Sequence, residues 1–323
     1  MSRRFFSTCI SAALVLLAAE GAAWAQACCA SPTAFAPARL RVGEDALVGF
    51  TANASWVTGS FDRTRSYTSL GPGSREVDLG QRLFVAAAPW KYTELAFTIP
   101  LAETYRASNG RKETGGGLGD LRLASRWTVV APGTDKVVPG IAVLSALTLP
   151  SGTPTEATHT PLATASTSPG VWQIDTGLAL EQPFGRFLVN LTGTVGWRAP
   201  RAMQGMHSQL GPAFSLFVGA SYTFKSMLSL GVSASYDASL DARVSGVDAP
   251  DSATAKTTLA LSGALPVGKG VRLLASTTWV PNVDYLGKND TASVGVSLGV
   301  VYAWGGPRSC PMHPGVTDCG CPP

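Results

Sequence analysis

Charged side chains are scarce in this chain of 323 residues: aspartate, glutamate, lysine and arginine together make up 14%. Basic residues outnumber acidic ones by 25 to 21 and form no basic run, so we expect no nucleic-acid partner. A composition with 45% hydrophobic residues and 35 glycines argues against disorder and is typical of a chain with many glycine-spaced strands.

The chain also lacks a second long apolar segment. After the N-terminus no run reaches about 18 consecutive apolar residues, which excludes a transmembrane helix there. The N-terminus itself has two arginines, then an apolar stretch from Ile10 to Ala19, then the small-x-small sequence Ala23-Trp24-Ala25. This order predicts a secretory signal peptide over residues 1–25, with the mature chain beginning at Gln26.

Instead, large apolar residues alternate with small or polar residues along the chain, and the segment from Thr291 to Trp304 shows this period of two clearly. One face carries Val294, Val296, Leu298, Val300, Tyr302 and Trp304, and the other carries Ser293, Gly295, Ser297, Gly299 and Ala303. A period of two predicts a β-strand. Because its apolar face ends in two aromatic residues, the segment resembles the closing strand of a bacterial outer-membrane barrel. An amphipathic strand of a soluble β-sandwich is the alternative.

Twelve alternating segments follow one another along the chain. They cover residues 44–57, 75–88, 91–105, 117–131, 138–149, 170–182, 186–198, 210–224, 227–242, 254–266, 269–280 and 291–304. Each is long enough to cross a bilayer, since a tilted strand needs about 9–11 residues. The connections alternate between long and short, as in outer-membrane barrels, which have short periplasmic turns and longer outer loops. A soluble sandwich has no reason to alternate so regularly.

We therefore expect an all-β fold: a transmembrane up-and-down antiparallel β-barrel of about 12 strands over residues 42–304. An even number of strands returns both ends of the chain to the periplasm. Residues 26–41 are expected to form a periplasmic N-terminal lead, and residues 305–323 a short cysteine-containing periplasmic tail. The expected location is the outer membrane of a Gram-negative bacterium, with the lipid bilayer and the barrel-insertion machinery as partners.

The inner face of such a barrel is expected to carry the charged residues of the alternating segments, because lipid covers the outer face. The lumen-facing candidates are Asp78, Arg82, Glu94, Asp120, Arg122, Arg126, Asp175, Glu181, Arg198, Asp237 and Arg272. Side chains of both signs can line a wet polar conduit, or they can pair across the interior and brace a closed barrel. Pro100 interrupts an otherwise regular strand and predicts a bulge or a bend.

Two short passages carry a resemblance to a known family. Gly117-Leu118-Gly119-Asp120-Leu121-Arg122-Leu123 opens a segment, and Ala146-Leu147-Thr148-Leu149-Pro150-Ser151-Gly152 ends one. Both are similar to strand boundaries of the outer-membrane proteins assigned to transport in the phenol meta-cleavage pathway (MetA-type). The resemblance covers residues 42–304 and implies a barrel that passes small hydrophobic or aromatic molecules. These motifs mark turns, and they carry over no catalytic or ligand residue.

The C-terminal tail holds a second resemblance. Cys310-Pro311-Met312-His313-Pro314 is similar to the CPMHP segment of heavy-metal-binding modules, although Cys319-Gly320-Cys321 departs from the CPxC pair that follows there. The ligand candidates for Zn or Cu(I) are Cys310, His313, Cys319 and Cys321. Disulfide bonds are the alternative, because the periplasm is oxidising. The mature cysteines Cys28, Cys29, Cys310, Cys319 and Cys321 are five, so one would stay unpaired.

Catalytic residues do not stand out. His159 and His207 lie in predicted outer loops near hydroxyl side chains, but nothing places a base and a nucleophile within hydrogen-bond reach. We therefore expect no enzyme, and a channel or transporter for a small hydrophobic or aromatic solute. The alternatives are an outer-membrane component linked to Cu or Zn handling through the tail, and a structural or lipid-modifying barrel.

Overall fold

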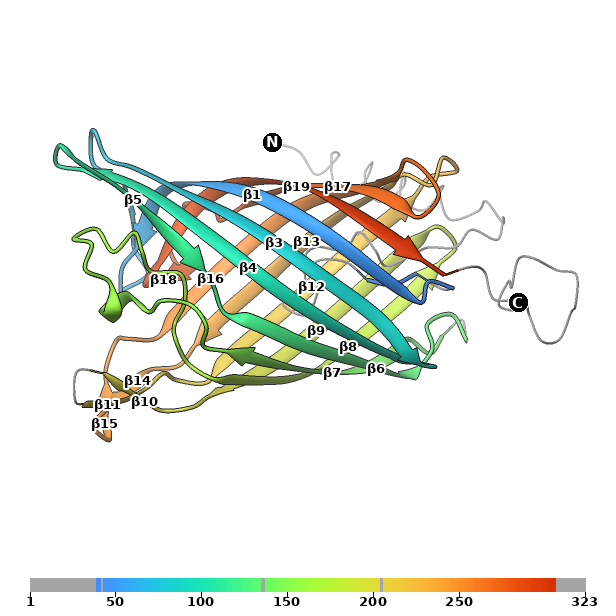
Figure 1. The fold of residues 1–323 in the computed structure, drawn as a ribbon, viewed down its shortest axis with the longest axis horizontal. Coiled ribbons are helices and arrows are strands. Elements are labelled where there is room, and N and C mark those ends of the chain that lie inside the picture. Colours follow the sequence, from blue (N-terminus) through green and yellow to red (C-terminus); the bar gives the residue numbers. More distant parts are fainter. Residues whose placement is uncertain (1–38, 42, 135–136, 204–205, 306–323) are drawn as a thin grey trace, which may run out of the picture.

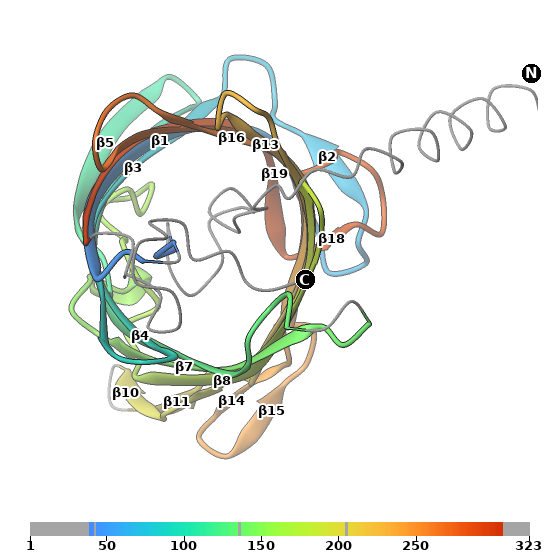
Figure 2. The same ribbon diagram turned by 90° about the vertical axis from the view of Figure 1, so that its right-hand side faces the viewer.

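The computed structural model describes residues 39–41, 43–134, 137–203 and 206–305. In this part of the chain, twelve long antiparallel strands close into a barrel (Figure 1, Figure 2). The barrel strands are β1 (Ala46–Phe61), β3 (Arg75–Trp90), β4 (Thr93–Ser108), β6 (Leu121–Val130), β7 (Gly140–Leu149), β8 (Gln173–Phe184), β9 (Phe187–Arg198), β12 (Ala213–Thr223), β13 (Ser229–Ser239), β16 (Thr254–Pro266), β17 (Val271–Trp279) and β19 (Asp290–Trp304). Each pairs with its neighbours in chain order, and β1 with β19 closes the circle. The predicted all-β, up-and-down barrel is confirmed.

The two ends of the barrel differ in the length of their connections. One end has the short turns, such as those between β3 and β4 and between β8 and β9. The long connections at the other end carry short elements: β2 (Tyr67–Ser69), β5 (Arg111–Leu118), η3 (Thr155–Ala157), β10 (Arg201–Met203), β11 (Met206–Gln209), β14 (Ala242–Val244), β15 (Val247–Ala249) and β18 (Gly287–Lys288). No helix in the described part is long and apolar enough to span a membrane.

Parts of the connections that the sequence predicted as loops are therefore strands, and turn chemistry explains two of them. The hairpin of β4 and β5 turns at Asn109 and Gly110, whose φ angles are 51° and 78°. The hairpin of β14 and β15 turns in the same way at Ser245 and Gly246, with φ angles of 52° and 82°. Two successive positive φ angles match the twist of the flanking strands, so the ladders extend beyond the barrel wall.

The closing pair shows the alternation directly. Ala46 lies opposite Trp304, and the register continues to Phe61 opposite Asp290. The predicted apolar face of β19 is exposed on the outside of the barrel; Leu298, for example, is 68% exposed. Val301 and Ala303 on the opposite face are buried. The soluble-sandwich alternative for this segment is excluded, because β19 is part of a single closed sheet.

Pro100 lies where β4 changes its partner. Leu101 is paired with Leu118 of β5, whereas Thr98 is paired with Arg122 of β6. These two pairs differ in register by one residue, which is the mark of a bulge. At the junction the amide of Gly119 donates to the carbonyl of Pro100 over 2.9 Å. Because proline has no amide proton, an interruption of the ladder costs least here.

An apolar cluster fills part of the interior near the short turns. Its buried members are Leu47, Phe84, Ala86, Ala96, Ala124, Ala142, Leu144, Ala146, Ala179, Val301 and Ala303. Leu40, which precedes β1, and Leu274 of β17 pack against them. The ring of Phe84 lies over Gly49 of the neighbouring strand, where any Cβ would overlap it. A wide side chain on one strand is thus matched by the absence of a side chain on the next.

We expect Phe84→Ala to lower the free energy of unfolding by about 3–5 kcal/mol, because a buried ring is replaced by a cavity. The matched control is Phe50→Ala on β1, since the Phe50 side chain is 41% exposed on the outer face. Urea-induced unfolding followed by tryptophan fluorescence measures both. Equal losses for the two variants would contradict the assignment of this cluster to the core.

Candidate functional site

The strand register brings charged side chains to the inner wall. On β3, Asp78 and Arg82 share a face with the buried Phe84, while Leu79 and Leu83 on the opposite face are exposed. The same parity applies around the barrel to Glu94 on β4, Arg122 and Arg126 on β6, Asp175 and Glu181 on β8, Arg198 on β9, Asp237 on β13 and Arg272 on β17. Asp120 lies between β5 and β6, where it accepts a hydrogen bond from the amide of Gly152.

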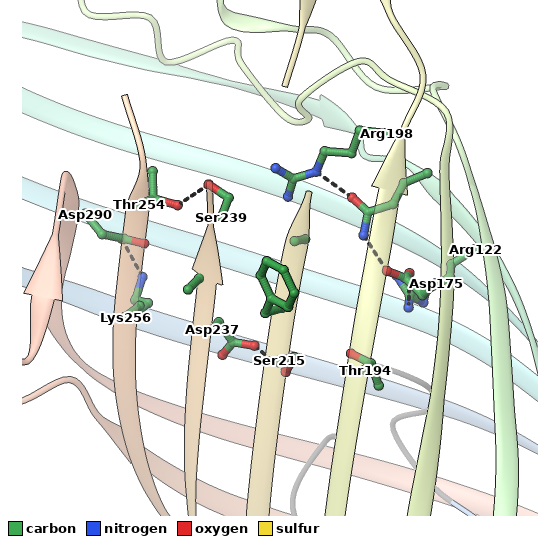
Figure 3. Close-up of a pocket in the computed structure, with 14 residues that line it drawn as sticks. Arg122, Asp175, Thr194, Arg198, Ser215, Asp237, Ser239, Thr254, Lys256 and Asp290 are labelled. Atoms are coloured by element: carbon green, nitrogen blue, oxygen red, sulfur yellow. Dashed lines mark hydrogen bonds and ion pairs between the residues drawn. The ribbon is translucent and has the colours of Figure 1, made fainter. Parts of the chain in front are cut away.

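A cavity of about 220 Å³ lies on the inner wall near the long connections (Figure 3). Four of the predicted lumen residues line it: Arg122, Asp175, Arg198 and Asp237. Lys256 and Asp290 add one charge of each sign. Polar side chains such as Gln173 and Ser215 separate these charges, whereas the Phe214 side chain lies on the outer face of β12 with Leu216 and Val218. The cavity is therefore lined by three cations and three anions.

A continuous chain of hydrogen bonds joins one side of this cavity. Arg122 donates to Asp175 over 2.7 Å, and the Asp175 carboxylate is 6% exposed. The amide of Gln173 donates to the other oxygen of Asp175 over 2.6 Å. Arg198 in turn donates through Nε to the Gln173 carbonyl oxygen over 2.8 Å. Side chains from β6, β8 and β9, with β7 between β6 and β8, thus hold one cation–anion pair and orient a second cation.

The other side of the cavity has separate contacts. Lys256 Nζ donates to Asp290 Oδ1 over 2.8 Å, and both side chains are 30% exposed. Lys256 is paired in register with Asp237, yet its ammonium group lies against Asp290. Asp237 instead accepts hydrogen bonds from the hydroxyl groups of Ser215, at 2.6 Å, and Ser235, at 3.3 Å.

A second group of charges lies deeper, toward the short turns. Glu181 of β8 accepts from Arg126 over 3.0 Å and also pairs with Arg39, a residue of the segment before β1. Glu181 itself is 5% exposed. Arg272 of β17 pairs with Glu44 over 3.0 Å and is 3% exposed. These pairs tie the segment that precedes β1 to two different places on the inner wall.

Arg82 and Asp78 are not brought into either group. Asp78 accepts a hydrogen bond from Thr104 of β4 over 3.0 Å. The Arg82 side chain is exposed on the inner face of β3, and no carboxylate of the described residues lies within 4.0 Å of it. Arg82 therefore offers a positive charge to whatever occupies the lumen at its level.

Sequence reasoning missed several members of these groups. Lys256 has the parity of the small inward residues of β16, so the period of two could have revealed it. The period of two could not have revealed Arg39 and Glu44. They lie at or before the start of the first alternating segment, and their partners are 142 and 228 residues away in sequence.

The predicted metal ligands Cys310, His313, Cys319 and Cys321 lie outside the described residues, and so do Cys28 and Cys29. The Zn or Cu(I) site and the alternative disulfides therefore stay predictions. Within residues 39–305, as far as the structure describes them, no group of three or more His, Cys, Asp or Glu side chains is placed to hold a metal ion.

Comparison with known proteins gives a likeness of fold. No protein-family model matches the chain, and no curated protein matches it in sequence. An outer membrane channel from Pseudomonas putida F1 is similar in structure, with a TM-score of 0.67 at 13% identity, covering 82% of this chain and 97% of that one. The translocator domain of the autotransporter NalP from Neisseria meningitidis gives a TM-score of 0.43 at 13% identity, covering 81% and 89%. The NanC porin gives 0.45 at 8% identity, covering 78% and 98%.

We expect Glu181→Gln to lower the free energy of unfolding by about 3–5 kcal/mol, because it leaves the buried Arg126 and the neighbouring Arg39 without their shared carboxylate. The control is Arg243→Gln. Its partner Asp248 is 69% exposed and Arg243 is 62% exposed, so the loss should stay below about 1 kcal/mol. Urea titration of both variants beside the parent protein measures the difference. A loss at Glu181 as small as the control's would show that this pair contributes little.

Proposed function

We propose that this chain is a channel of the bacterial outer membrane that passes a small solute through the barrel. The observation that carries the proposal is the division of polarity between the two faces of one closed sheet. The outer face is apolar, and the inner face holds charges of both signs and a cavity. A water-soluble barrel would show the reverse arrangement, because an exposed apolar surface of this extent is costly in water.

The tryptophans support the membrane location. The described part holds seven, all 46–67% exposed: Trp56, Trp90, Trp127, Trp172, Trp197, Trp279 and Trp304. Four lie near the long connections (Trp56, Trp172, Trp197 and Trp279), and three near the short turns (Trp90, Trp127 and Trp304). Tryptophan prefers the two interfaces of a bilayer, so two rings of tryptophan mark its two boundaries.

The spacing of these rings fits a bilayer. Val294 of β19 is paired with both Trp56 and Trp279, so it lies at the level of one ring, and Trp304 belongs to the other. Ten residues separate Val294 from Trp304. At about 3.3 Å per residue and a tilt of about 45°, they span roughly 23 Å, close to the apolar band of known outer-membrane barrels. We propose that the short turns, and with them both ends of the barrel, face the periplasm.

The interior supports transport rather than catalysis. His159 and His207 are both exposed, and neither imidazole has a hydrogen-bond partner in the described part of the chain. The sequence resemblance implies a small hydrophobic or aromatic solute. The cavity adds polar groups to that description, because six charged side chains line it. We therefore propose a solute with an aromatic or apolar body and at least one charged group.

Depth-dependent quenching tests the membrane location. In variants that keep only Trp56 or only Trp304, with phenylalanine at the other positions, we expect stronger quenching by lipids brominated near the headgroup than by lipids brominated near the chain ends. The control introduces Leu298→Trp into the tryptophan-free background, since Leu298 lies between the two rings on the outer face. This residue should show the opposite order. The same order for all three would contradict the proposed position in the bilayer.

Conductance in planar bilayers and solute entry into liposomes test the channel. We expect measurable conductance, and Arg82→Gln should raise the permeability of K⁺ relative to Cl⁻ by at least about twofold, because it removes an unpaired positive charge from the lumen. Arg75→Gln is the matched control, since Arg75 lies on the opposite face of the same strand. A folded, inserted barrel with neither conductance nor solute entry would favour the closed, braced barrel instead.

A further inference from the structure

The connection between β7 and β8 folds back onto the barrel wall. It runs from Pro150 to Trp172 and contains the short helix η3. In the view along the barrel, part of this green connection lies within the ring of strands (Figure 2). Residues 153–169 of it, here called the mouth segment, contact β4, β5 and β10.

Two charged side chains hold the mouth segment at Leu162. Arg106 of β4 donates through Nη1 to the Leu162 carbonyl over 2.6 Å, and Glu113 of β5 accepts a hydrogen bond from the Leu162 amide over 2.7 Å. Arg106 and Glu113 lie opposite each other in the strand register. Arg106 also donates through Nε and Nη2 to Glu76 of β3, over 2.9 and 2.8 Å. A cation and an anion thus bind the two backbone groups of one residue through charge-assisted hydrogen bonds, which are stronger than those between neutral groups.

These side chains place the mouth segment on the inner side of the wall. Glu76 is two residues from Asp78 on β3, so it lies on the inner face that Asp78 and Arg82 share. Arg106 is paired in register with Glu76 and belongs to the same face. A segment bonded to this face occupies part of the mouth of the lumen, at the end with the long connections.

The mouth segment is also packed closely against β5. Thr164 is fully buried, and its backbone lies over Gly115, where a Cβ would come within 2.6 Å of the Thr164 carbonyl carbon. The hydroxyl group of Thr167 donates to the Leu118 carbonyl over 2.7 Å. Glycine at position 115 therefore has a structural reason, because it allows the segment to approach the strand this closely.

The neighbouring connection anchors both flanks of the mouth segment. Arg201 of β10 donates to Glu156 over 3.0 Å and also to the carbonyl of Pro169. The Arg201 side chain is only 14% exposed, although β10 is not one of the twelve barrel strands. The segment is thus attached at its centre by Arg106 and Glu113 and at its flanks by Arg201.

We infer that the mouth segment is a constriction that limits the width of the solutes that pass, an inference that rests on the proposed channel function. Arg106 and Glu113 are its positioning residues, because they hold Leu162 against the inner wall. No residue of the mouth segment lines the charged cavity, so the constriction and the cavity are separate parts of the lumen. The segment narrows the mouth from the side of β4 and β5.

The double variant Arg106→Gln/Glu113→Gln releases Leu162 and leaves the net charge of the chain unchanged. We expect its single-channel conductance in planar bilayers to rise at least about twofold above that of the parent protein, because passage through a pore depends on its width. In liposome swelling, the uptake rate of sucrose relative to that of the smaller sugar arabinose should also rise at least about twofold.

Digestion with a glutamate-specific protease measures the release of the segment independently of transport. Glu156 is the one glutamate of the mouth segment, and cleavage after it should be faster in the double variant, because proteases cut exposed, loosely held loops. Glu113→Gln alone keeps the ion pair of Arg106 with Glu76. It should change conductance, sugar uptake and cleavage in the same direction by a smaller amount, and it tests the inference even if the double variant fails to insert.

The matched control is Arg243→Gln/Asp248→Asn, which removes an exposed ion pair from another long connection and touches no residue of the mouth segment. Its conductance, sugar uptake and cleavage at Glu156 should equal those of the parent protein. Faster cleavage in the Arg106 and Glu113 variants with unchanged conductance and sugar uptake would overturn the inference, and so would an equal rise in the control. No change in any of the three measurements would overturn it too, while leaving the channel function intact. Absence of conductance in the parent protein would instead count against the channel itself.

Discussion

Closure of the backbone hydrogen-bond ladder is the constraint on which the rest of this structure depends. Each of the twelve long strands has a partner on both sides, and the pairing of β1 with β19 leaves no free edge among them. In a lipid environment a free edge would expose unpaired amides and carbonyls, each at a cost of several kcal/mol. Closure also creates an inside and an outside. From that point the parity of a residue decides whether it meets the surroundings of the barrel or its interior.

The inner face of the barrel forms two different regions, a packed one and a cavity. Toward the short turns, apolar side chains and buried ion pairs fill the space, and the segment before β1 contributes Leu40 and Arg39 to both. Buried ion pairs are weak contributors to stability by themselves, because both charges lose water. Their value here is positional: Glu181 fixes the segment before β1 against two strands of the wall. Toward the long connections, the packing opens into a cavity where only four of the six charged side chains form ion pairs.

These two regions lie in series along one lumen. The cavity lies toward the long connections, and the packed region lies toward the short turns. Two charged groups of the cavity are held by neutral polar side chains, Arg198 by Gln173 and Asp237 by Ser215, and the other four form two ion pairs. Arg82 belongs to neither charged group, and no carboxylate of the described residues lies within 4.0 Å of it.

Much of the architecture can be predicted from the sequence, because it depends on residues that are close together along the chain. The period of two places Val294 and Leu298 on one face and Ser297 on the other in any strand of this sequence, and long and short connections fix the direction of successive strands. Parity likewise assigns Arg122, Asp175, Arg198 and Asp237 to the inner face from the sequence alone. The hairpin of β4 and β5 is an exception: Asn109-Gly110 is a turn signal, but the glycine-rich sequence that follows it favours a loop.

The ion-pair partners of the inner-face residues could not be predicted from the sequence. Glu44 forms an ion pair with Arg272, which is 228 positions away in the sequence. Lys256 forms an ion pair with Asp290 and not with Asp237, its neighbour in the strand register. Such contacts depend on the curvature of the closed wall and on which side chains share one level of the lumen. By itself, the sequence determined the strands, their order and the face of each side chain, since these depend on neighbours along the chain. Only the tertiary structure decided which charges form ion pairs and which do not, because pairing depends on distances between strands that are set only when the barrel closes.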